Sequence, residues 1–480
     1  QPFSDVTQDP QPAQVEYFNA RTNRAGGFPV DHFNERASVT MRLTSNLLRR
    51  SKPKPSVGLP TSNETFSGLL AQNGTTLPFY HVDVSVVRQQ CKRWHKALPF
   101  VTPHYAVKCN PDPVVLRVMH ECGAGYDCAS LNEIQEALRF VKRGDVGGVA
   151  PTPAPFVPDI LFANPIKEPQ SIQQAAALGV HQTTADSVEE LDKIAKYNPE
   201  AQVMLRILVD DDDSRCRLGN KYGAPMDQIE TILLKAQALN IHMTGVSFHV
   251  GSGQTNPQAY ASAIQRARVA FDIGHRCGHR QMNVLNLGGG FIDDPVFESV
   301  ASVIRRSIEE SFPLWQRQHR NGRSAALSII AEPGRFFVSQ SFKLVTKIIG
   351  RKGSMVYIND SVYGSFNNIM YDHALVQPEG IMSHDGSRVQ WYDDGEEQEG
   401  EDSSGNSASI WGQTCDGLDR ITTSSSSRLN DADVGEWLIW PNMGAYTSSA
   451  ASRFNGFEPP NVFYNMDGES VAELKVEAYR

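Results

Sequence analysis

Short apolar segments alternate with amphipathic, helix-like segments from about residue 78 to residue 338, and this rhythm restricts the fold more than any other feature of the sequence. Alternating strands and helices predict parallel strands joined by right-handed crossovers. Eight such units in roughly 255 residues match the size of a (β/α)8, TIM-like barrel. An open doubly wound sheet is the competing architecture, but no GxGxxG motif follows the first strand. The strand candidates are HYAVK, AGYDCAS, DILFANP, VHQTTAD, QVMLRIL, TGVSFHV, NVLNLGG and LSIIAEPG.

The predicted helices between these strands carry capping signals. PDPVVLRVMHECG has a proline near its start and a glycine at its end. Two other segments open with a capping box, which pairs Ser130 with Glu133 and Ser187 with Glu190. These signals support the helical half of the strand–helix pattern.

After about residue 338 the segments become β-rich, without comparable helices between them. We therefore predict a second, mainly β domain of the Greek-key barrel or sandwich kind. A Pro-rich stretch, GGVAPTPAPFVP, is interpreted as a surface insertion in the barrel. The predicted divisions are a partly disordered N-terminal extension (1–76), whose later part is expected to pack on the β domain, the barrel (77–338), and the β domain (339–480), with an acidic and Ser-rich insertion at about 376–433.

Composition and charge exclude several classes of function. The 480 residues carry a formal charge of −9, and no basic run of the kind that binds nucleic acid is present. No apolar run of ~18 or more residues predicts a membrane span. The first residues lack the pattern of a signal peptide, so a cytoplasmic location is the default expectation. Seven scattered cysteines without a CxxC pair predict free thiols and argue against a disulfide framework or a zinc site.

Chemically reactive side chains recur where the predicted strands end. In a (β/α)8 barrel these C-terminal strand ends form the mouth of the active site. Lys108 is an unusual residue for this position, because an amine at the end of a buried strand is costly to desolvate. The residues expected at this mouth are Lys108, Asp127, Glu133, Arg206, His249, Gly251, Ser252, Gly253, Gly288, Gly289, Gly290, Glu332 and Arg335.

Together these residues suit a phosphorylated aldehyde. Successive glycines let backbone N–H groups approach phosphate oxygens closely, and Arg335 can add charge-assisted hydrogen bonds. A desolvated lysine such as Lys108 suits a Schiff base with an aldehyde. Aldehyde and phosphate together describe pyridoxal 5′-phosphate, whose ring nitrogen needs an acidic partner such as Glu332.

Each residue also has an ordinary structural interpretation. Gly288–Gly290 can be a tight turn, and Glu133 can be only the acid of its capping box. His249 can be a satisfied buried histidine and Arg206 an ion-pair partner. Lys108 can be a strand-end lysine whose amine reaches solvent. The functional interpretation depends on the joint placement of these residues at the strand ends.

Nine stretches between about residues 78 and 465 match one known family, and the last four are more specific than any single glycine motif. The stretches are YAVKCN, GYDCASLNEI, FANPIK, GVSFHVGSG, LNLGGGF, AEPGRFF, YGSFNNIMYDHA, TCDGLD and NMGAYTSSAASRFNGF. With them the chain resembles eukaryotic ornithine decarboxylases, which are fold-type III pyridoxal-phosphate-dependent decarboxylases.

The resemblance implies how the cofactor is held. Lys108 is similar to the lysine that bonds the cofactor aldehyde, Glu332 to the partner of the ring nitrogen, and His249 to the imidazole that stacks on the ring. The implied phosphate site comprises Ser252, Gly288, Gly289, Gly290, Arg335 and Tyr446. The implied polar network beside the cofactor comprises Asp127, Glu133 and Arg206.

The resemblance also implies a homodimer with shared active sites. Cys415 is similar to a cysteine delivered across the dimer interface, where it helps to position the substrate carboxylate and to protonate the correct carbon. Asp416, donated with it, and Asp372 are similar to the carboxylates that receive the distal amine of the substrate. Tyr371 and Phe454 complete the implied substrate-binding set.

The implied reaction is decarboxylation of L-ornithine to putrescine and CO2, the first step of polyamine biosynthesis. Its implied catalytic residues are Lys108, Cys415, His249 and Glu332. Ornithine and lysine differ by one methylene, worth only ~1–3 kcal/mol of discrimination, so decarboxylation of lysine or another basic amino acid stays open. A third alternative is a non-enzymatic binding protein of the antizyme-inhibitor kind, which is expected to lack some of these catalytic residues. Animal relatives bind a protein antizyme, which makes an antizyme a candidate partner.

Overall fold

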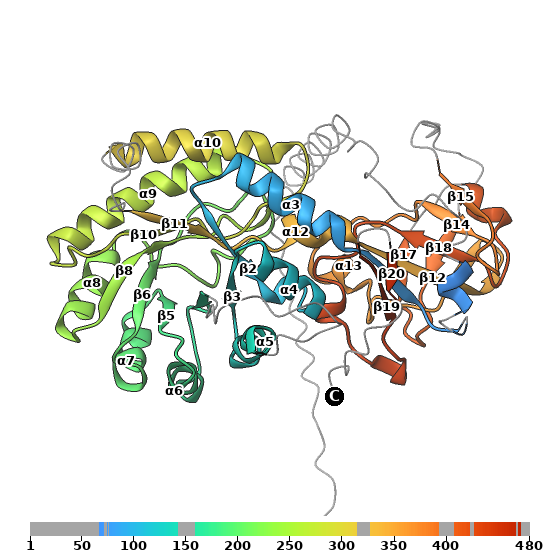
Figure 1. Cartoon of the computed structure of the whole chain (residues 1–480), viewed down its shortest axis with the longest axis horizontal. Coiled ribbons are helices and arrows are strands. Elements are labelled where there is room, and N and C mark those ends of the chain that lie inside the picture. The colour runs from blue at the N-terminus through green and yellow to red at the C-terminus, as the bar shows by residue number, and fades with distance from the viewer. Residues whose placement is uncertain are drawn as a thin grey trace, which may run out of the picture. The chain divides into compact units, whose positions relative to one another are not determined.

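Eight parallel strands close into a barrel, which confirms the prediction from the strand–helix alternation (Figure 1). Around the barrel the strands follow the order β10-β11-β2-β3-β4-β5-β6-β8. Six of the predicted segments contain one of these strands, and the other two overlap β2 and β8, which begin two residues earlier than predicted. The barrel strands are β2 (Thr102–Ala106), β3 (Gly125–Cys128), β4 (Ile160–Phe162), β5 (Gln182–Ala185), β6 (Gln202–Arg206), β8 (His242–Ser247), β10 (Val284–Asn286) and β11 (Ser328–Ala331).

The computed structural model describes residues 67–71, 74, 76–142, 159–313, 327–392, 408–422, 427–466 and 469–471. Three predicted features lie outside the described residues: the N-terminal extension up to residue 66, the Pro-rich stretch 147–158 and the acidic stretch 393–407. All the described residues belong to one unit of the chain, Pro55–Arg480.

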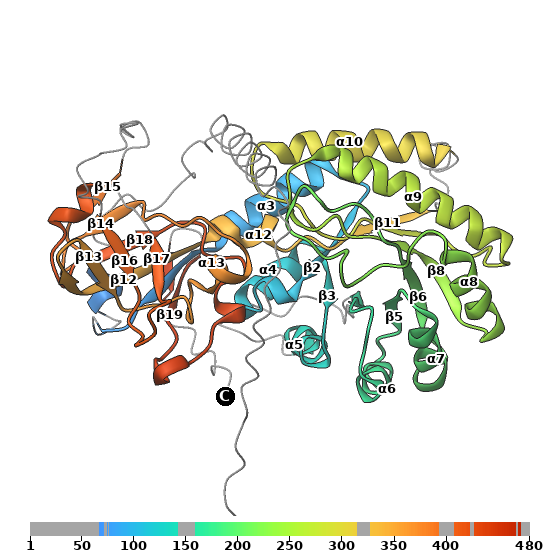
Figure 2. The same cartoon turned by 180° about the vertical axis from the view of Figure 1, so that it is seen from behind.

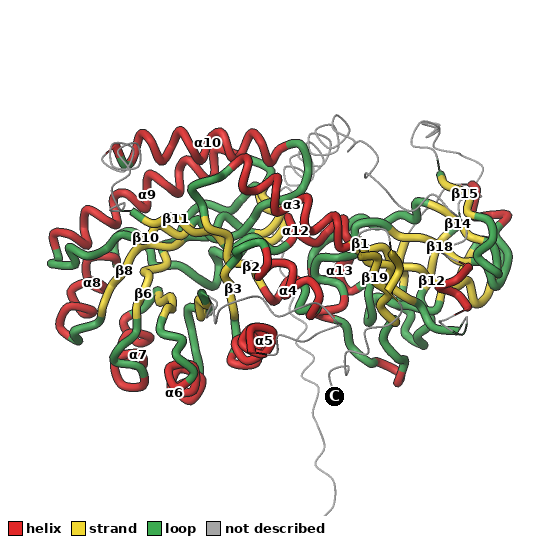
Figure 3. Tube along the Cα trace, in the orientation of Figure 1, coloured by secondary structure: helices red, strands yellow, loops and turns green. Residues whose placement is uncertain are grey.

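Helices cover the outside of the barrel (Figures 1 and 3). The Ser187 hydroxyl accepts a hydrogen bond from the Glu190 N–H at 3.3 Å, as its capping box predicted. Buried apolar side chains of these helices join those of the strands in one core. The helices are α3 (Val84–Ala97), α4 (Pro113–Glu121), α5 (Leu131–Lys142), α6 (Pro169–Ala177), α7 (Val188–Tyr197), α8 (Ile229–Ala238), α9 (Pro257–Arg276), α10 (Val296–Ser311) and the short α12 (Arg335–Val338).

Two short strands that the sequence did not indicate form an antiparallel pair beside the barrel. β7 (Ser214–Cys216) pairs with β9 (Ser252–Gln254), with Cys216 opposite Ser252. β7 follows β6 and β9 follows β8 along the chain, so each lies beyond the C-terminal end of a barrel strand. This is the end at which active sites of the fold are found.

The C-terminal part of the chain contributes to a separate, ten-stranded and mainly antiparallel sheet, which confirms the predicted β domain. Its main path runs β15-β14-β18-β12-β1-β19-β20, and β13, β16 and β17 extend from β12 (Figure 2). The strands are β1 (Phe79–Asp83), β12 (Phe342–Lys352), β13 (Met355–Ile358), β14 (Gly380–Met382), β15 (Val389–Trp391), β16 (Ser409–Trp411), β17 (Arg420–Thr422), β18 (Trp437–Trp440), β19 (Asn461–Met466) and β20 (Glu469–Val471). The short helical segments are α13 (Asn367–Tyr371), η2 (Ser339–Ser341), η3 (Ser427–Asp431), η4 (Ser448–Ala450) and η5 (Phe454–Gly456).

This sheet takes one interior strand from the segment that precedes the barrel. β1 pairs antiparallel with β12 and parallel with β19. Leu69 and Leu70, in a helical turn at 67–71, are buried with Phe79 and Trp437 in one apolar cluster. The chain therefore first contributes β1 to the β domain, then forms the barrel, and then forms the remaining strands of the β domain.

Close contacts tie the β domain to the turn after the first barrel strand. The N–H of Tyr446 donates to the Cys109 carbonyl at 2.9 Å, and the Asn110 amide donates to the Gly444 carbonyl at 2.9 Å. A Cβ on Gly444 would lie 1.8 Å from the Val338 carbonyl oxygen, so only glycine allows this approach. Side chains of the β domain are thereby held against the C-terminal end of β2.

All seven cysteines are free, as the sequence predicted. Cys109 and Cys128 are buried near the barrel mouth, whereas Cys415 is exposed. Among the helices that the structure describes, none is long and apolar enough to span a bilayer.

Candidate active site

Lys108 lies two residues beyond strand β2, in the 3₁₀ turn η1 (Val107–Cys109), and not within the strand. Its ammonium group pairs with the carboxylate of Asp127 on the neighbouring strand β3. Asp127 is fully buried, and its Oδ1 has no hydrogen-bond partner. Register explains the pairing, because Ala106 lies opposite Asp127. A buried acid on the next strand therefore compensates the amine.

The Lys108 ammonium is stabilised as a cation. Burial lowers the pKa of Lys108, but Asp127, Tyr446 and Glu332 raise it more, so the pKa lies above its usual value. The side chain is also 39% exposed, so part of it is open to solvent while its amine is paired. To react as a nucleophile, Lys108 must lose one proton, and the hydrogen bond to Asp127 holds its amine in place.

Glu332 is held by Asn286, a residue that the sequence interpretation missed. The Asn286 amide donates to Glu332 Oε1 at 2.7 Å, and Asn286 Oδ1 accepts the N–H of Gly288 at 2.9 Å. Burial and Asp127 raise the pKa of Glu332 to about 7, although Lys108 lowers it. The available signal was a polar residue two positions before the triple glycine in VLNLGGG. Glu332 can therefore gain or lose a proton near neutral pH.

His249 packs against the turn Gly288–Gly290, which we call the triple-glycine turn. His249 Nδ1 accepts the N–H of Gly251 at 3.0 Å, which orients the ring. A Cβ on Gly289 would lie 2.7 Å from His249 Nε2. Gly288 and Gly290 have φ values of 62° and 103°, which glycine adopts without strain. The imidazole can lie here only because the turn has no side chains.

Arg206, at the end of β6, adds positive charge to the same mouth. Its guanidinium lies over the Tyr222 ring, 5.1 Å from the centroid. Burial lowers the pKa of Arg206, and Glu332 raises it. Burial and Arg206 together lower the pKa of His249 well below its usual value, so the imidazole is neutral at pH 7.

Arg335 and Asp372 form a bidentate ion pair between the barrel and the β domain. Arg335 Nη1 and Nη2 donate to the two carboxylate oxygens at 2.7 and 2.6 Å. Nη2 also donates to Ser252 Oγ at 3.1 Å, and the guanidinium lies 5.0 Å from the centroid of the Tyr446 ring. Burial lowers the pKa of Arg335, but Asp372 raises it more. Four of the predicted site residues meet in this contact.

Glu133 helps to cap the start of α5, but its carboxylate accepts from Ala129 instead of Ser130, the partner that the capping box predicted. Its Oε2 accepts the N–H of Ala129 at 2.6 Å, and its own N–H donates to Ser130 Oγ at 3.3 Å. Burial raises the pKa of Glu133; Asp127 raises it further and Lys108 lowers it, so all three share one electrostatic environment. The ordinary interpretation as a helix cap holds, and a role beside the cofactor stays a prediction.

The donor set at this mouth fits pyridoxal 5′-phosphate. The triple-glycine turn, Ser252 and Arg335 offer hydrogen-bond donors for an anion. Arg335 Nε and Asp127 Oδ1 are buried polar atoms without partners in the described part of the chain. Lys108 supplies an amine for an aldehyde, and Glu332 supplies an acid for a ring nitrogen. Each reactive part of the cofactor therefore has a matching group.

Cys415, Asp416 and Phe454 form a second cluster, on the surface of the β domain. The Tyr363 hydroxyl donates to Asp416, and the Tyr363 ring stacks on Phe454 with centroids 4.3 Å apart. This hydrogen bond lowers the pKa of Asp416. Within the described residues, no hydrogen bond or ion pair links the cluster to Lys108. The structure thus divides the predicted residues between two places on one subunit.

Three residues around Asp372 and Asp416 escaped the sequence interpretation. Tyr363 lies within the matched stretch YGSFNNIMYDHA, which was a usable signal. Arg215 and Cys216 approach Asp372 from β7, a strand too short and polar to be predicted. The predicted Tyr371 ends helix α13 and is 75% exposed.

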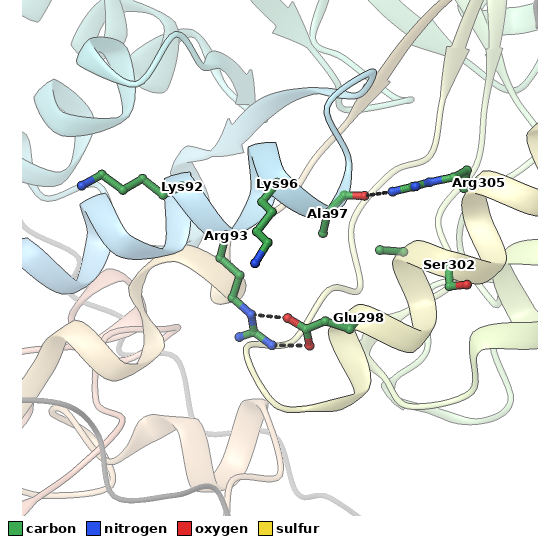
Figure 4. Close-up of a pocket in the computed structure, with 8 residues that line it drawn as sticks. Lys92, Arg93, Lys96, Ala97, Glu298, Ser302 and Arg305 are labelled. Atoms are coloured by element: carbon green, nitrogen blue, oxygen red, sulfur yellow. Dashed lines mark hydrogen bonds and ion pairs between the residues drawn. The ribbon is translucent and has the colours of Figure 1, made fainter.

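A separate cavity of about 580 Å³ lies between α3 and α10 (Figure 4). Lys92, Lys96 and Arg305 line it, together with Arg93, which is already engaged by Glu298 through two hydrogen bonds of 2.7 Å. These are surface cations without a buried acid beside them. The cavity therefore lacks the groups that make the barrel mouth a candidate active site.

The model of one protein family matches residues 84–339, and its description is pyridoxal-dependent decarboxylase, pyridoxal binding domain. Rat ornithine decarboxylase is 40% identical over 410 residues, which cover 81% of this chain and 80% of the relative. The ornithine decarboxylase of Saccharomyces cerevisiae is 38% identical and covers 82% and 81%. The resemblance inferred from the motifs is confirmed.

Solved structures agree with these relatives. The arginine decarboxylase of Paramecium bursaria Chlorella virus, bound to agmatine, has a TM-score of 0.71 at 33% identity, covering 84% of this chain and all of that one. A lysine/ornithine decarboxylase of Vibrio vulnificus, complexed with putrescine, has a TM-score of 0.67 at 25% identity and covers 86% and 100%. With the lysine, the acids and the triple-glycine turn at one barrel mouth, these similarities show that the chain belongs to the pyridoxal-dependent decarboxylase family.

Proposed function

We propose that this chain converts L-ornithine to putrescine and CO2 with pyridoxal 5′-phosphate, which is the first step of polyamine biosynthesis. The observation that carries the chemistry is the Lys108 amine, paired with buried Asp127 and under the influence of Glu332. The choice of ornithine is supported by the 37–40% identity to ornithine decarboxylases of rat and fungi over most of the chain.

The residues at the barrel mouth would hold the cofactor. Bound pyridoxal 5′-phosphate supplies an aldehyde that bonds amino groups and a protonated ring that accepts the electron pair left by CO2. Lys108 would bond the aldehyde, Glu332 would keep the proton on the ring nitrogen, and His249 would pack against the ring. The proposed phosphate site comprises Ser252, Gly288, Gly289, Gly290, Arg335 and Tyr446, and the proposed polar network beside it comprises Asp127, Glu133 and Arg206.

Proton transfer in the proposed reaction involves Lys108, Glu332 and Cys415. The Lys108 ammonium group, which pairs with Asp127, must lose a proton before the amine attacks. Glu332, with its raised pKa, keeps a proton available at neutral pH. We assign to Cys415 the protonation of the substrate carbon after CO2 has left.

Two carboxylates would bind the distal amine of the substrate. Asp372 is buried at the edge of the barrel mouth, and Asp416 is oriented by Tyr363. Phe454 and Tyr371 would flank the alkyl chain. A neutral amino acid would offer no cation to these two carboxylates, which favours a basic substrate.

We propose a homodimer in which each active site takes residues from both subunits. Cys415 and Asp416 lie on the surface of the β domain, in a cluster of their own. Leu418, next to them in sequence, is 70% exposed, and Leu375, close to Asp372, is 93% exposed. A second copy that covers these apolar side chains would bring its Cys415 to the Lys108 mouth.

The remaining assignments follow from chemistry and family. Free thiols at all seven cysteines suit a reducing compartment, and we propose a cytoplasmic location. A protein antizyme is proposed as a partner on the family resemblance alone. The net charge of −9 does not favour nucleic acid as a ligand.

The decisive experiment is spectroscopic and chemical. The purified protein reconstituted with pyridoxal 5′-phosphate should absorb near ~420 nm through its bond to a protein amine. It should then release CO2 and putrescine from ornithine. A protein that releases no CO2 from ornithine would contradict the proposal, and absence of the band as well would favour the non-enzymatic alternative.

A second candidate is decarboxylation of lysine or arginine. The structural similarity to an arginine decarboxylase and to a lysine/ornithine decarboxylase supports it. Ornithine, lysine and arginine should therefore be supplied in competition, with the three product amines separated by chromatography. Predominant release of cadaverine or agmatine would replace ornithine as the substrate.

A further inference from the structure

Asp372 is surrounded by more positive charge than one carboxylate can neutralise. Arg335 holds both its oxygens through hydrogen bonds of 2.7 and 2.6 Å. Arg215 Nη1 also lies 3.5 Å from Oδ2, and the Cys216 thiol donates to Oδ1 at 3.6 Å. Two guanidinium groups thus share one negative charge, at the carboxylate that is proposed to receive the distal amine of the substrate.

The two arginines differ in how firmly they are held. The Arg335 side chain is 10% exposed and also donates to Ser252. The Arg215 side chain is 41% exposed and approaches the carboxylate through a single contact. Arg215 can therefore move into solvent at little cost, whereas Arg335 cannot, because burying an unpaired guanidinium is expensive.

The β7–β9 strand pair sets the direction of the Arg215 side chain. A Cβ on Gly253 would lie 3.0 Å from Arg215 Cβ and 3.5 Å from Nε. Gly253 itself has a φ of 69°, which favours glycine. The missing side chain at Gly253 leaves space for Arg215 to lie across β9 toward Asp372.

We propose that Arg215 is a specificity-determining residue that acts as an exchangeable counter-ion of Asp372. It neutralises Asp372 before substrate binds, and the distal ammonium group of the substrate or diamine product displaces it. Three cations cannot share one carboxylate without repulsion, so each binding event must break the Arg215 contact. The proposal rests on the proposed function, because it takes Asp372 as the acceptor of that ammonium group.

The test uses the cofactor-loaded enzyme and three variants: Arg215→Gln, Arg215→Lys and Arg217→Gln. Arg217→Gln is the matched control, because it removes the same charge from the same loop. Arg217 is 52% exposed and pairs with Asp212 at 2.9 Å, away from Asp372. The measurements are KM and kcat for ornithine and the dissociation constant of putrescine by calorimetry.

Arg215→Gln should lower both the KM for ornithine and the dissociation constant of putrescine by about two- to fivefold. This is the change in affinity expected when a half-exposed ion pair no longer has to be broken. Arg215→Gln should change KM more than it changes kcat. Arg215→Lys should restore most of the wild-type values, since it keeps the charge. The difference in KM and in the dissociation constant between Arg215→Gln and the wild type should decrease as the ionic strength rises.

An unchanged or higher dissociation constant in Arg215→Gln would overturn the proposal, and so would an equal decrease in Arg217→Gln. Measurements on the wild-type enzyme distinguish a failure of the proposed function from a failure of the role proposed for Arg215. If the wild type neither binds putrescine nor releases CO2 from ornithine, the proposed function fails. If it does both while the variants do not differ from it, only the role of Arg215 fails.

Discussion

At the scale of residues, Asp127 contributes most to keeping Lys108 charged, with Tyr446 and Glu332 adding to it. Asp127 is fully buried and compensates the ammonium group, while the lysine side chain remains partly open to solvent. This combination separates two roles of the lysine, because charge neutralisation needs only a cation and covalent attachment needs a nucleophilic amine.

Lys108→Ala and Lys108→Arg test these roles separately. Both variants should lose the absorbance band near ~420 nm. Both should also lower kcat by about 10²- to 10⁴-fold or more, because each removes an amine that bonds the cofactor and transfers protons. Only Lys108→Ala leaves Asp127 buried and unpaired, so it alone should unfold at a clearly lower temperature. Near-normal kcat in either variant would contradict the assignment of Lys108.

Glu332 should make the cofactor-free protein sensitive to pH. Its pKa is raised from 4.5 to about 7 in the folded state. The folded protein therefore binds this proton more tightly than the unfolded chain does, so the contribution is fully present below pH 4.5 and is lost as pH rises through about 7. The unfolding temperature of the cofactor-free protein should fall from pH 5 to pH 8 less steeply in Glu332→Gln than in the wild type. Parallel curves for the two proteins would disprove this.

At the scale of elements, the loop after β18 controls how the β domain meets the barrel. The N–H of Tyr446 binds the carbonyl next to Lys108, and Gly444 passes against the Val338 carbonyl. The contact between the β domain and the barrel therefore affects the geometry of the barrel mouth through this loop.

Gly444→Ala should destabilise the protein by about 1–3 kcal/mol, because the added methyl group has no room and the loop must shift. The free energy of unfolding in urea measures the effect. Gly350→Ala is the control, since a Cβ there meets no atom within 4 Å. Equal stability of the two variants would show that the loop adjusts freely.

At the scale of the whole molecule, the division of site residues between two clusters predicts complementation between subunits. Lys108→Ala and Cys415→Ala homodimers should each be nearly inactive. Mixed and reassorted, they should regain about a quarter of the wild-type activity, because half of the dimers are mixed and each has one intact site. Mixed dimers verified by mass spectrometry that remain inactive would rule out the shared site.

Periodicity and strand-end chemistry were sufficient to predict the barrel, the β domain and the cofactor. Every barrel strand overlaps a predicted segment, although β2 and β8 each begin two residues earlier than predicted. A strand buried on both faces shows its apolar character in the local sequence. Lys108, Glu332 and the triple-glycine turn follow those strands directly. Their convergence was predictable because parallel strands bring their C-terminal ends to one edge.

The sequence by itself therefore determined the architecture and the kinds of chemical group at its mouth. Only the tertiary structure decided which groups neutralise one another: Lys108 by Asp127, Glu332 with Asn286, and Asp372 between two arginines. These pairs join residues 19 to 157 positions apart, as for Lys108 with Asp127 and Arg215 with Asp372. Local patterns cannot specify them, because electrostatic pairing depends on distance in space and on burial, which chain folding sets.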